Sequence, residues 1–235
     1  MDFSIFSGPA FWAALLSIIV ANILLSGDNA VVIALASRNL PPAQQKKAIF
    51  WGSAAAIILR VILTITAVQL LSLPYLKIIG AILLIYIGVQ LLADSDDEAD
   101  MEGHSNIWGA IRTILVADLV MSLDNVIAVA AAAQKGPEET RLILLIIGLG
   151  LSIPLIIFGS TMLLKVMDRF PIIITLGAGL LGLLAGGMLV EDPAIKDSMQ
   201  AAFEDAHMIF EGIGVAIVLL VGTYLKKKSG NKEAT

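Results

Sequence analysis

Two related strings, VANILLSGDN at residues 20–29 and VADLVMSLDN at residues 116–125, decide how this chain is organised. Each string lies inside a strongly apolar segment that is long enough to cross a lipid bilayer. An Asp at the centre of a membrane helix costs about 2.5 to 3.5 kcal/mol on insertion scales, so a polar string that occurs twice at that depth indicates a function. We interpret the two strings as halves of one cation site.

The composition is that of a polytopic membrane protein. Of the 235 residues, 58% are hydrophobic and only 15% are charged, and the mean hydropathy is +0.91. Since a span needs about 17 to 25 apolar residues, segmentation by turn and charge signals predicts an all-α fold with seven transmembrane helices. The predicted helices are 11–37, 48–73, 75–92, 107–133, 142–164, 171–190 and 206–225.

Basic residues near the span ends predict the orientation of the chain. If the Lys-rich C-terminal tail is cytoplasmic, seven spans place the N-terminus outside. Ten Lys and Arg residues near span ends then lie inside and four lie outside, a bias that favours this orientation. The ten are Arg38, Lys46, Lys47, Arg112, Lys165, Arg169, Lys226, Lys227, Lys228 and Lys232, and the four are Lys77, Lys135, Arg141 and Lys196.

The similarity between the two strings extends into an internal repeat. An offset of 96 residues aligns Asp28 with Asp124 and Asn29 with Asn125, and it also aligns Gly52 with Gly148. Three spans repeated directly must enter the membrane from opposite sides, so the halves have inverted topology, with the substrate expected at their interface. The predicted units are a first repeat (1–93), an acidic cytoplasmic linker (94–106), a second repeat (107–190), and a loop, seventh helix and basic tail (191–235).

The polar positions of each string share a helix face. On a straight helix Asn22, Ser26 and Asn29 lie at i, i+4 and i+7, and Asp118, Ser122 and Asn125 repeat that spacing. Asp28 and Asp124 lie about 100° away from these faces. They can join the same site if the helix loosens at Ser26 and Gly27, where glycine permits unusual dihedrals, or if a neighbouring helix closes that side.

The resulting groups are carboxylates, carboxamides, hydroxyls and the backbone carbonyls that a loosened turn would free, without sulfur or a nearby imidazole. Such oxygen ligands suit Mg²⁺, Ca²⁺ or Mn²⁺ better than zinc or copper. Three carboxylates also favour a divalent ion over Na⁺, and protons are expected to replace the ion when the site is empty. The alternative is that these groups only form hydrogen bonds between helices, an interpretation that is strongest for Ser26 and Ser122.

Other charged residues near the spans have two interpretations each. Arg60 lies mid-span, where the second repeat has Ile156, and an arginine at that depth needs a carboxylate or carbonyl partner. We expect it to be either a structural counter-ion or a part of ion release. Glu191, Asp192 and Glu211 lie on the predicted outer side, where a role in the ion pathway competes with simple solvation.

The sequence resembles the TerC family of integral membrane proteins over about residues 10–225. The resemblance rests on SGDN and SLDN, with LPPAQQKKAIFWG at 40–52, GLGLSIP at 148–154 and RFP at 169–171. The family is named for an association with tellurite resistance, and its bacterial members are linked to manganese export. The resemblance implies seven helices, a bacterial plasma membrane and a Mn²⁺ efflux role. The positions that match the family motif are Asp28, Asn29, Asp118, Asp124 and Asn125.

We therefore expect a secondary exporter of Mn²⁺, with Ca²⁺ as an alternative ion and protons as the exchanged species. No nucleotide-binding loop is present in the sequence, and neither a prosthetic group nor a nucleic-acid partner is expected. An intramembrane aspartyl protease is disfavoured because each Asp is followed by Asn, which suits ion coordination better than water activation. A further alternative is an accessory membrane protein that binds the secretion machinery or supplies metal to exported proteins.

Overall fold

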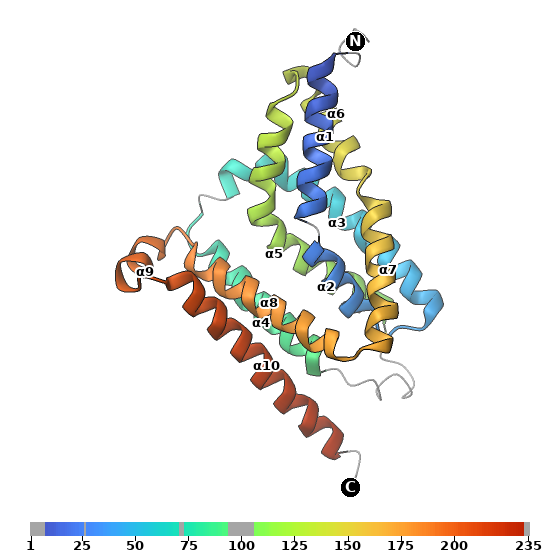
Figure 1. Ribbon diagram of the computed structural model, residues 1–235, viewed down its shortest axis with the longest axis vertical. Coiled ribbons are helices and arrows are strands. Elements are labelled where there is room, and N and C mark those ends of the chain that lie inside the picture. The colour runs from blue at the N-terminus through green and yellow to red at the C-terminus, as the bar shows by residue number, and fades with distance from the viewer. Residues whose placement is uncertain (1–7, 26, 71–72, 94–105, 233–235) are drawn as a thin grey trace.

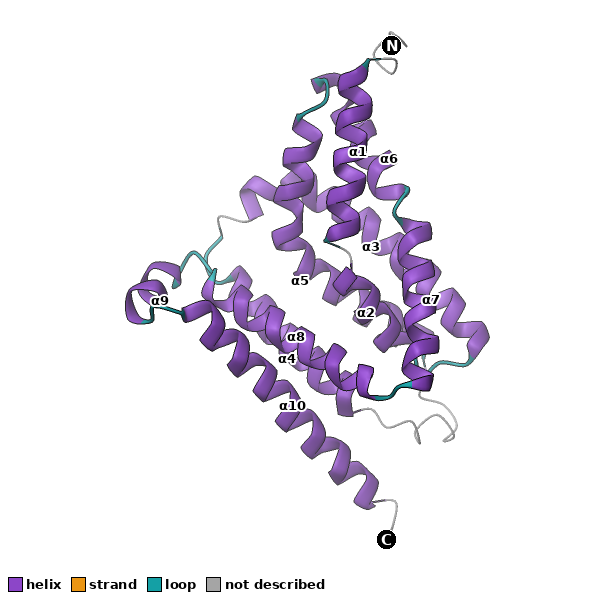
Figure 2. Cartoon of the chain, viewed as in Figure 1, coloured by secondary structure: helices purple, strands orange, loops and turns teal. Residues whose placement is uncertain are grey.

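The computed structural model describes residues 8–25, 27–70, 73–93 and 106–232. These residues are all-helical, without strands (Figure 2). The predicted acidic linker lies outside the described residues, apart from its last position, Asn106. Asn106 caps the following helix, because its side-chain oxygen accepts a hydrogen bond of 3.0 Å from the backbone N–H of Trp108.

The helices follow the predicted order of spans. They are α1 (Pro9–Leu24), α2 (Gly27–Ser37), α3 (Pro42–Leu70), α4 (Leu76–Ala93), α5 (Ile107–Gln134), the 3₁₀ turn η3 (Glu138–Thr140), α6 (Arg141–Gly150), α7 (Ile153–Arg169), α8 (Ile172–Val190), α9 (Lys196–Ala202) and α10 (Ala206–Lys232). Within the described residues, five helical stretches are long and apolar enough to cross a bilayer. The number rises to seven if each of two bent helix pairs is counted as one span. The chain is therefore a polytopic membrane protein.

Several helix boundaries differ from the sequence-based predictions, and the predicted helix 142–164 is two helices, α6 and α7. The helix α3 begins at Pro42 instead of residue 48, because proline lacks the N–H that a first helical position leaves unused. At the other end of the chain, α10 continues to Lys232, since lysine is a good helix former. The short helix α9 was not predicted, because its polar sequence has no apolar periodicity.

The helices pack in two groups (Figure 1). In one group α8 contacts both α4 and α10, and in the other α5 contacts α1, α2 and α3. Helices of the first half of the sequence pack against helices of the second half: α3 contacts α5, α2 contacts α7, and α1 contacts α6. The first helices of both halves are thus brought together at the centre of the larger group.

Glycines bring α8 and α10 into close contact. A Cβ atom on Gly182 would collide with the backbone of Gly214, and one on Gly186 would collide with the backbone of Phe210. A glycine of α10 shows the same close approach, since a Cβ on Gly214 would collide with the backbone of Gly182. Small residues at a helix interface allow this backbone-to-backbone packing.

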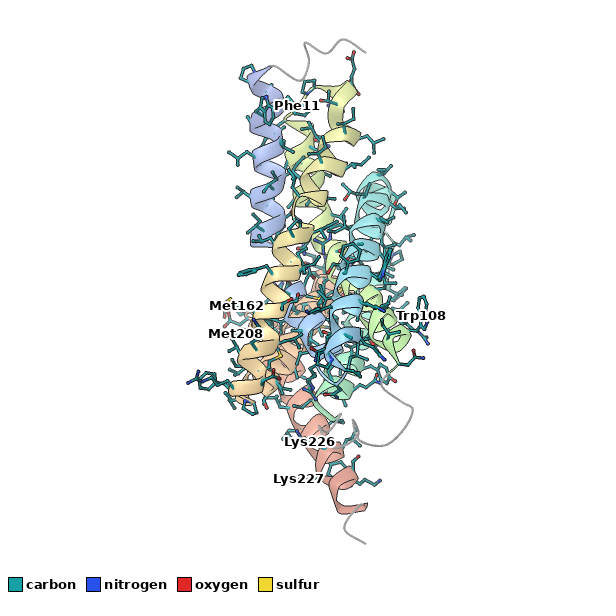
Figure 3. The ribbon with its side chains drawn as sticks, turned by 90° about the vertical axis from the view of Figure 1, so that its right-hand side faces the viewer. Phe11, Trp108, Met162, Met208, Lys226 and Lys227 are labelled. Atoms are coloured by element: carbon teal, nitrogen blue, oxygen red, sulfur yellow. The ribbon has the colours of Figure 1, made fainter. Side chains whose placement is uncertain are left out.

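The two described ends of the chain lie far apart. Figure 3 shows Phe11 near one end of the molecule and Lys226 and Lys227 near the other, on the part of α10 that extends beyond the other helices. Large apolar side chains cover the outer surface between them, including Trp108 and Phe158, which are 72% and 68% exposed. Such a surface is suited to contact with lipid.

Candidate functional site

Both polar strings lie where a helix changes direction. The segments Pro9–Ile23 and Gly27–Ser37 meet at 48°, and α5 bends by 62° between Ile107–Leu123 and Asn125–Gln134. The first bend has the glycine that the sequence analysis expected at this position, since α2 begins at Gly27. Bent helices inside a membrane leave backbone groups that must bind a partner, so they mark places where ions or substrates are held.

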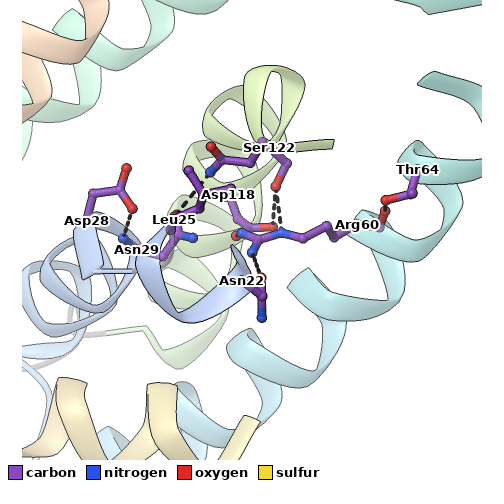
Figure 4. A network of polar contacts seen from close by, with 9 residues as sticks. Asn22, Leu25, Asp28, Asn29, Arg60, Thr64, Asp118 and Ser122 are labelled. Carbon is purple, nitrogen blue, oxygen red and sulfur yellow. Dashed lines mark hydrogen bonds and ion pairs between the residues drawn. The ribbon is translucent and has the colours of Figure 1, made fainter. Parts of the chain in front are cut away.

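A buried arginine joins three helices next to these bends (Figure 4). Arg60 of α3 is 1% exposed, and its Nε donates to Ser122 Oγ over 3.0 Å. One terminal nitrogen donates to Asn22 Oδ1 over 2.7 Å, and the other forms an ion pair with the Asp118 carboxylate. The Arg60 backbone carbonyl accepts a hydrogen bond from Thr64 Oγ1 at 2.7 Å. Arg60 thus contacts one predicted site residue of α1 and two of α5.

The second oxygen of Asp118 is also occupied. Ser122 Oγ donates to Asp118 Oδ2 over 3.2 Å, one helical turn along α5. The hydroxyl therefore accepts from Arg60 and donates to Asp118, which closes a ring of charge-assisted hydrogen bonds. Because all three side chains are buried, each bond forms in a low-dielectric surrounding where it is stronger than in water.

Asp28 and Asn29 lie in the first turn of α2. The Asp28 carboxylate accepts a hydrogen bond of 2.8 Å from the backbone N–H of Asn29, and a carboxylate at a helix N-terminus is favoured by the helix dipole. Asn29 is 3% exposed, yet among the described residues neither its Oδ1 nor its Nδ2 has a hydrogen-bond partner. A buried carboxamide without a partner is costly, so it points to a ligand.

The two strings contact each other directly. Asn125 Nδ2 of α5 donates to the backbone carbonyl of Leu25 over 3.2 Å. Leu25 follows the last residue of α1, at the loosened turn where free backbone carbonyls were expected from the sequence, although Leu25 itself was not named. The signal that a carbonyl would be free was present in Gly27, which predicted the break. A carbonyl oxygen at such a break is a further oxygen ligand for a hard cation.

Part of the predicted metal set lies outside what the structure describes. Ser26 and the side chain of Asp124 are not described. Among the side chains that are described, no group of three His, Cys, Asp or Glu residues lies close enough to hold a metal ion. The assignment of Asp28, Asn29, Asp118, Asp124 and Asn125 to one metal site therefore stays a prediction.

Asp192, a predicted pathway residue, caps a helix. It is fully buried, and Oδ1 accepts from the backbone N–H groups of Tyr75 at 2.9 Å and Ala194 at 2.8 Å. Its Oδ2 accepts from Lys77 at 3.0 Å and Ile78 at 3.2 Å. Burial by itself raises the pKa of this carboxyl, but the four N–H groups more than offset it and hold that pKa below its usual value.

Tyr75 shows how strongly this cap shapes the backbone. Its φ of 68° lies in the left-handed region, which is uncommon for a residue with a side chain. The bond from its N–H to Asp192 stabilises that conformation at the start of α4. Sequence reasoning missed this role because cap and helix are 117 residues apart in the chain.

Glu191 and Glu211 belong to a charged cluster beside this cap. Lys77 Nζ lies 2.9 Å from Glu191 Oε2, and His207 lies between the two carboxylates, with Nε2 3.3 Å from Glu191 and Nδ1 3.4 Å from Glu211. Burial raises the pKa of Glu191, but the hydrogen bond and charge of Lys77 outweigh burial and lower that pKa. The cluster joins the ends of α4, α8 and α10.

Sequence comparisons place this arrangement among membrane proteins. Residues 7–230 match the family model described as integral membrane protein TerC family. The chain is similar to the uncharacterized membrane protein YjbE of Bacillus subtilis (strain 168), with 41% identity over 214 residues that cover 91% of this chain and 95% of the relative. No solved structure matches the chain.

More distant relatives share the same segment. The uncharacterized membrane protein YceF of the same Bacillus strain is 27% identical over 244 residues, which cover 98% of this chain and 89% of the relative. The UPF0053 protein YegH of Escherichia coli (strain K12) is 24% identical over 204 residues, which cover 78% of this chain and 37% of the relative. The similarity to YegH is therefore confined to part of that longer protein.

Proposed function

Because the chain belongs to the TerC family of integral membrane proteins, we propose that it is a secondary transporter that exports Mn²⁺ from the cytoplasm in exchange for protons. It acts as a transporter and not as an enzyme. The observation that carries the proposal is the meeting of the two polar strings at bent helices, where the buried Asn29 carboxamide has no hydrogen-bond partner among the described residues.

The chemistry of the surrounding groups supports a hard divalent cation. Asp28 supplies a carboxylate, Asn29 a carboxamide and Leu25 a backbone carbonyl at the end of α1. Asp124 and Asn125 occupy the matching positions of the second string. Oxygen ligands of this kind suit Mn²⁺ and Ca²⁺, and the chain contains no cysteine that would favour a softer metal.

The packing of the helices supports transport by rocking of two halves. The pairing of α3 with α5, and of α7 with α2 and α6 with α1, is the arrangement that a twofold axis between inverted repeats would produce. We place the ion at that axis, with the N-terminus outside the cell and the C-terminus in the cytoplasm of a bacterium. The basic residues at the span ends favour this orientation.

The test is Mn²⁺ flux through sealed proteoliposomes with the internal pH followed at the same time. We expect the parent protein to move Mn²⁺ with an opposite movement of protons, and Asp28→Asn and Asp124→Asn to lose the flux. Asp197→Asn is the matched control, because it makes the same substitution at an exposed position in α9. Flux that persists in Asp28→Asn contradicts the proposed site. Absence of flux in well-folded parent protein contradicts transport and favours an accessory membrane protein.

A further inference from the structure

The carboxylate of Asp118 is fully engaged within the protein. Its Oδ1 pairs with Arg60 and its Oδ2 accepts the hydroxyl of Ser122 at 3.2 Å. Asp118 is 7% exposed, and the two partners are 1% and 0% exposed. A transported ion that used Asp118 as a ligand would have to compete with a buried ion pair each time it bound.

The charge of Arg60 keeps the Asp118 carboxylate in this ion pair. A guanidinium keeps its charge in any protein environment, and a buried charge that loses its partner is strongly destabilising. A divalent cation on Asp118 would also lie beside the positive charge of Arg60. Asp28 and Asn29 differ in this respect, since the Asp28 carboxylate accepts its hydrogen bond from a neutral donor, the N–H of Asn29, and the Asn29 carboxamide is unpartnered among the described residues.

The repeat gives an independent argument. The offset of 96 residues aligns Asp118 with Asn22 and Arg60 with Ile156. Arg60 belongs to the first half and Asp118 to the second, and the residues aligned with them, Ile156 and Asn22, carry no charge. The Asp and Asn residues at the ends of the two strings are identical in both halves. The repeat therefore duplicates neither charge, and these two charges pair with each other across the two halves.

We propose that Asp118 is the counter-ion of Arg60 and not a ligand of the transported cation, so that the ion is held by the Asp and Asn residues at the ends of the two strings. Asp118 and Arg60 are then positioning residues, which tie α3 to α5 beside the bend. The identity of the ion rests on the proposed function, whereas the pairing of the two side chains does not. This assignment departs from the sequence-based prediction that Asp118 binds the metal.

The test compares single and double variants of the full chain in detergent. The variants are Asp118→Asn, Arg60→Met, Asp118→Asn with Arg60→Met, and Asp118→Asn with Arg60→Ile, which introduces the neutral residues found at the aligned positions 22 and 156. We expect each single variant to lower the melting temperature by on the order of 10 °C, because it leaves one buried charge unpaired. We expect the double variants to recover most of that loss, because neither buried charge remains.

Binding of MnCl₂ by calorimetry separates a counter-ion from a ligand. We expect the double variants to bind Mn²⁺ within about threefold of the parent, and Asp28→Asn, the control for ligand loss, to bind at least about tenfold more weakly. A double variant that folds like the parent but binds as weakly as Asp28→Asn overturns the inference. If the parent itself binds no Mn²⁺, the proposed function fails, but the melting temperatures still test the pairing of Asp118 with Arg60. Recovery of the melting temperature in the double variants supports the pairing, and additive losses refute it.

Discussion

The Arg60 guanidinium forms a buried ion pair with the Asp118 carboxylate, 58 positions later in the chain. The same guanidinium donates to Asn22 on α1 and to Ser122 on α5. One side chain of α3 therefore fixes the relative positions of the first helix of each half. The planar fork explains why an arginine stands here, because its donors are spread over three nitrogens, whereas all three donors of an ammonium leave from one atom.

Arg60→Lys is expected to destabilise the protein although it conserves the charge. Lysine keeps the attraction to Asp118 but leaves at least one buried acceptor of Asn22 or Ser122 without a donor, which costs about 1 to 3 kcal/mol. The measurement is the melting temperature of the purified protein in detergent. Arg141→Lys is the control, since Arg141 pairs with Glu138 at an exposed position where such pairs contribute little. Equal melting temperatures for the parent and Arg60→Lys would show that the fork geometry is unimportant.

Gly186→Ala is expected to separate α8 from α10. Its Cβ would collide with the backbone of Phe210, which cannot move without shifting the whole helix, and overpacking of this kind costs about 1 to 3 kcal/mol. Gly179→Ala lies on the same buried helix, but its Cβ would meet only side-chain atoms of Leu219 and Val215, the nearest at 3.7 Å. We expect a lower melting temperature for the first variant and an unchanged one for the second. Similar values for both would contradict the close approach of the two helices.

Asp192→Ala is expected to weaken the start of α4. The substitution leaves four partly buried N–H groups without their acceptor, among them that of Tyr75 in its left-handed conformation. Removal of such an acceptor costs about 1 to 3 kcal/mol. The melting temperature is the measurement, and Asp197→Ala at an exposed position is the control. A loss no larger than that of the control would show that the cap does not stabilise the fold.

The same carboxylate gives a prediction for pH. The pKa of Asp192 is lower in the folded protein than its usual value, so the stabilisation by its charge is complete above the unfolded pKa of about 3.9 and is lost as the pH falls through the lower folded value. The difference in melting temperature between the parent and Asp192→Asn should therefore be constant at neutral pH and should shrink below about pH 4. A difference that shrinks between pH 8 and pH 6 would assign the effect to another group.

The sequence was sufficient for the features that depend on local pattern. Apolar length predicted a polytopic, all-helical chain, and Gly27 predicted the loosened turn at which α2 begins. The bend of α5 has no such signal, because Leu123 stands where the first string has glycine. That bend of 62° depends on the helices that pack around α5, which local sequence does not specify.

Partners that are distant in the sequence were the least predictable part of the candidate site. An intramembrane Arg60 required a carboxylate or carbonyl, but only the folded chain shows that Asp118 fulfils this requirement and that Ser122 occupies its second oxygen. Asp192 was interpreted from its position at a span end, where solvation and an ion pathway were the alternatives. Its role as a cap became visible once α4 and α8 were placed side by side.

Asn29→Leu is expected to separate function from stability. Because the buried carboxamide of Asn29 has no hydrogen-bond partner among the described residues, an apolar side chain of similar size removes the cost of burying it, about 1 to 3 kcal/mol. The variant should therefore melt at the same or a higher temperature than the parent. Its Mn²⁺ flux in proteoliposomes should fall by at least about tenfold, because an oxygen ligand of the proposed site is lost.

The control for this variant is Ser53→Ala. Ser53 of α3 is 1% exposed, and its hydroxyl also has no hydrogen-bond partner among the described residues, but it is not part of the proposed ion site. Its replacement should stabilise the protein without any change in flux. If Asn29→Leu destabilises the protein and Ser53→Ala does not, the Asn29 carboxamide holds the fold together. If Asn29→Leu keeps full flux, transport does not depend on the Asn29 carboxamide, and Asn29 is not a ligand of the ion.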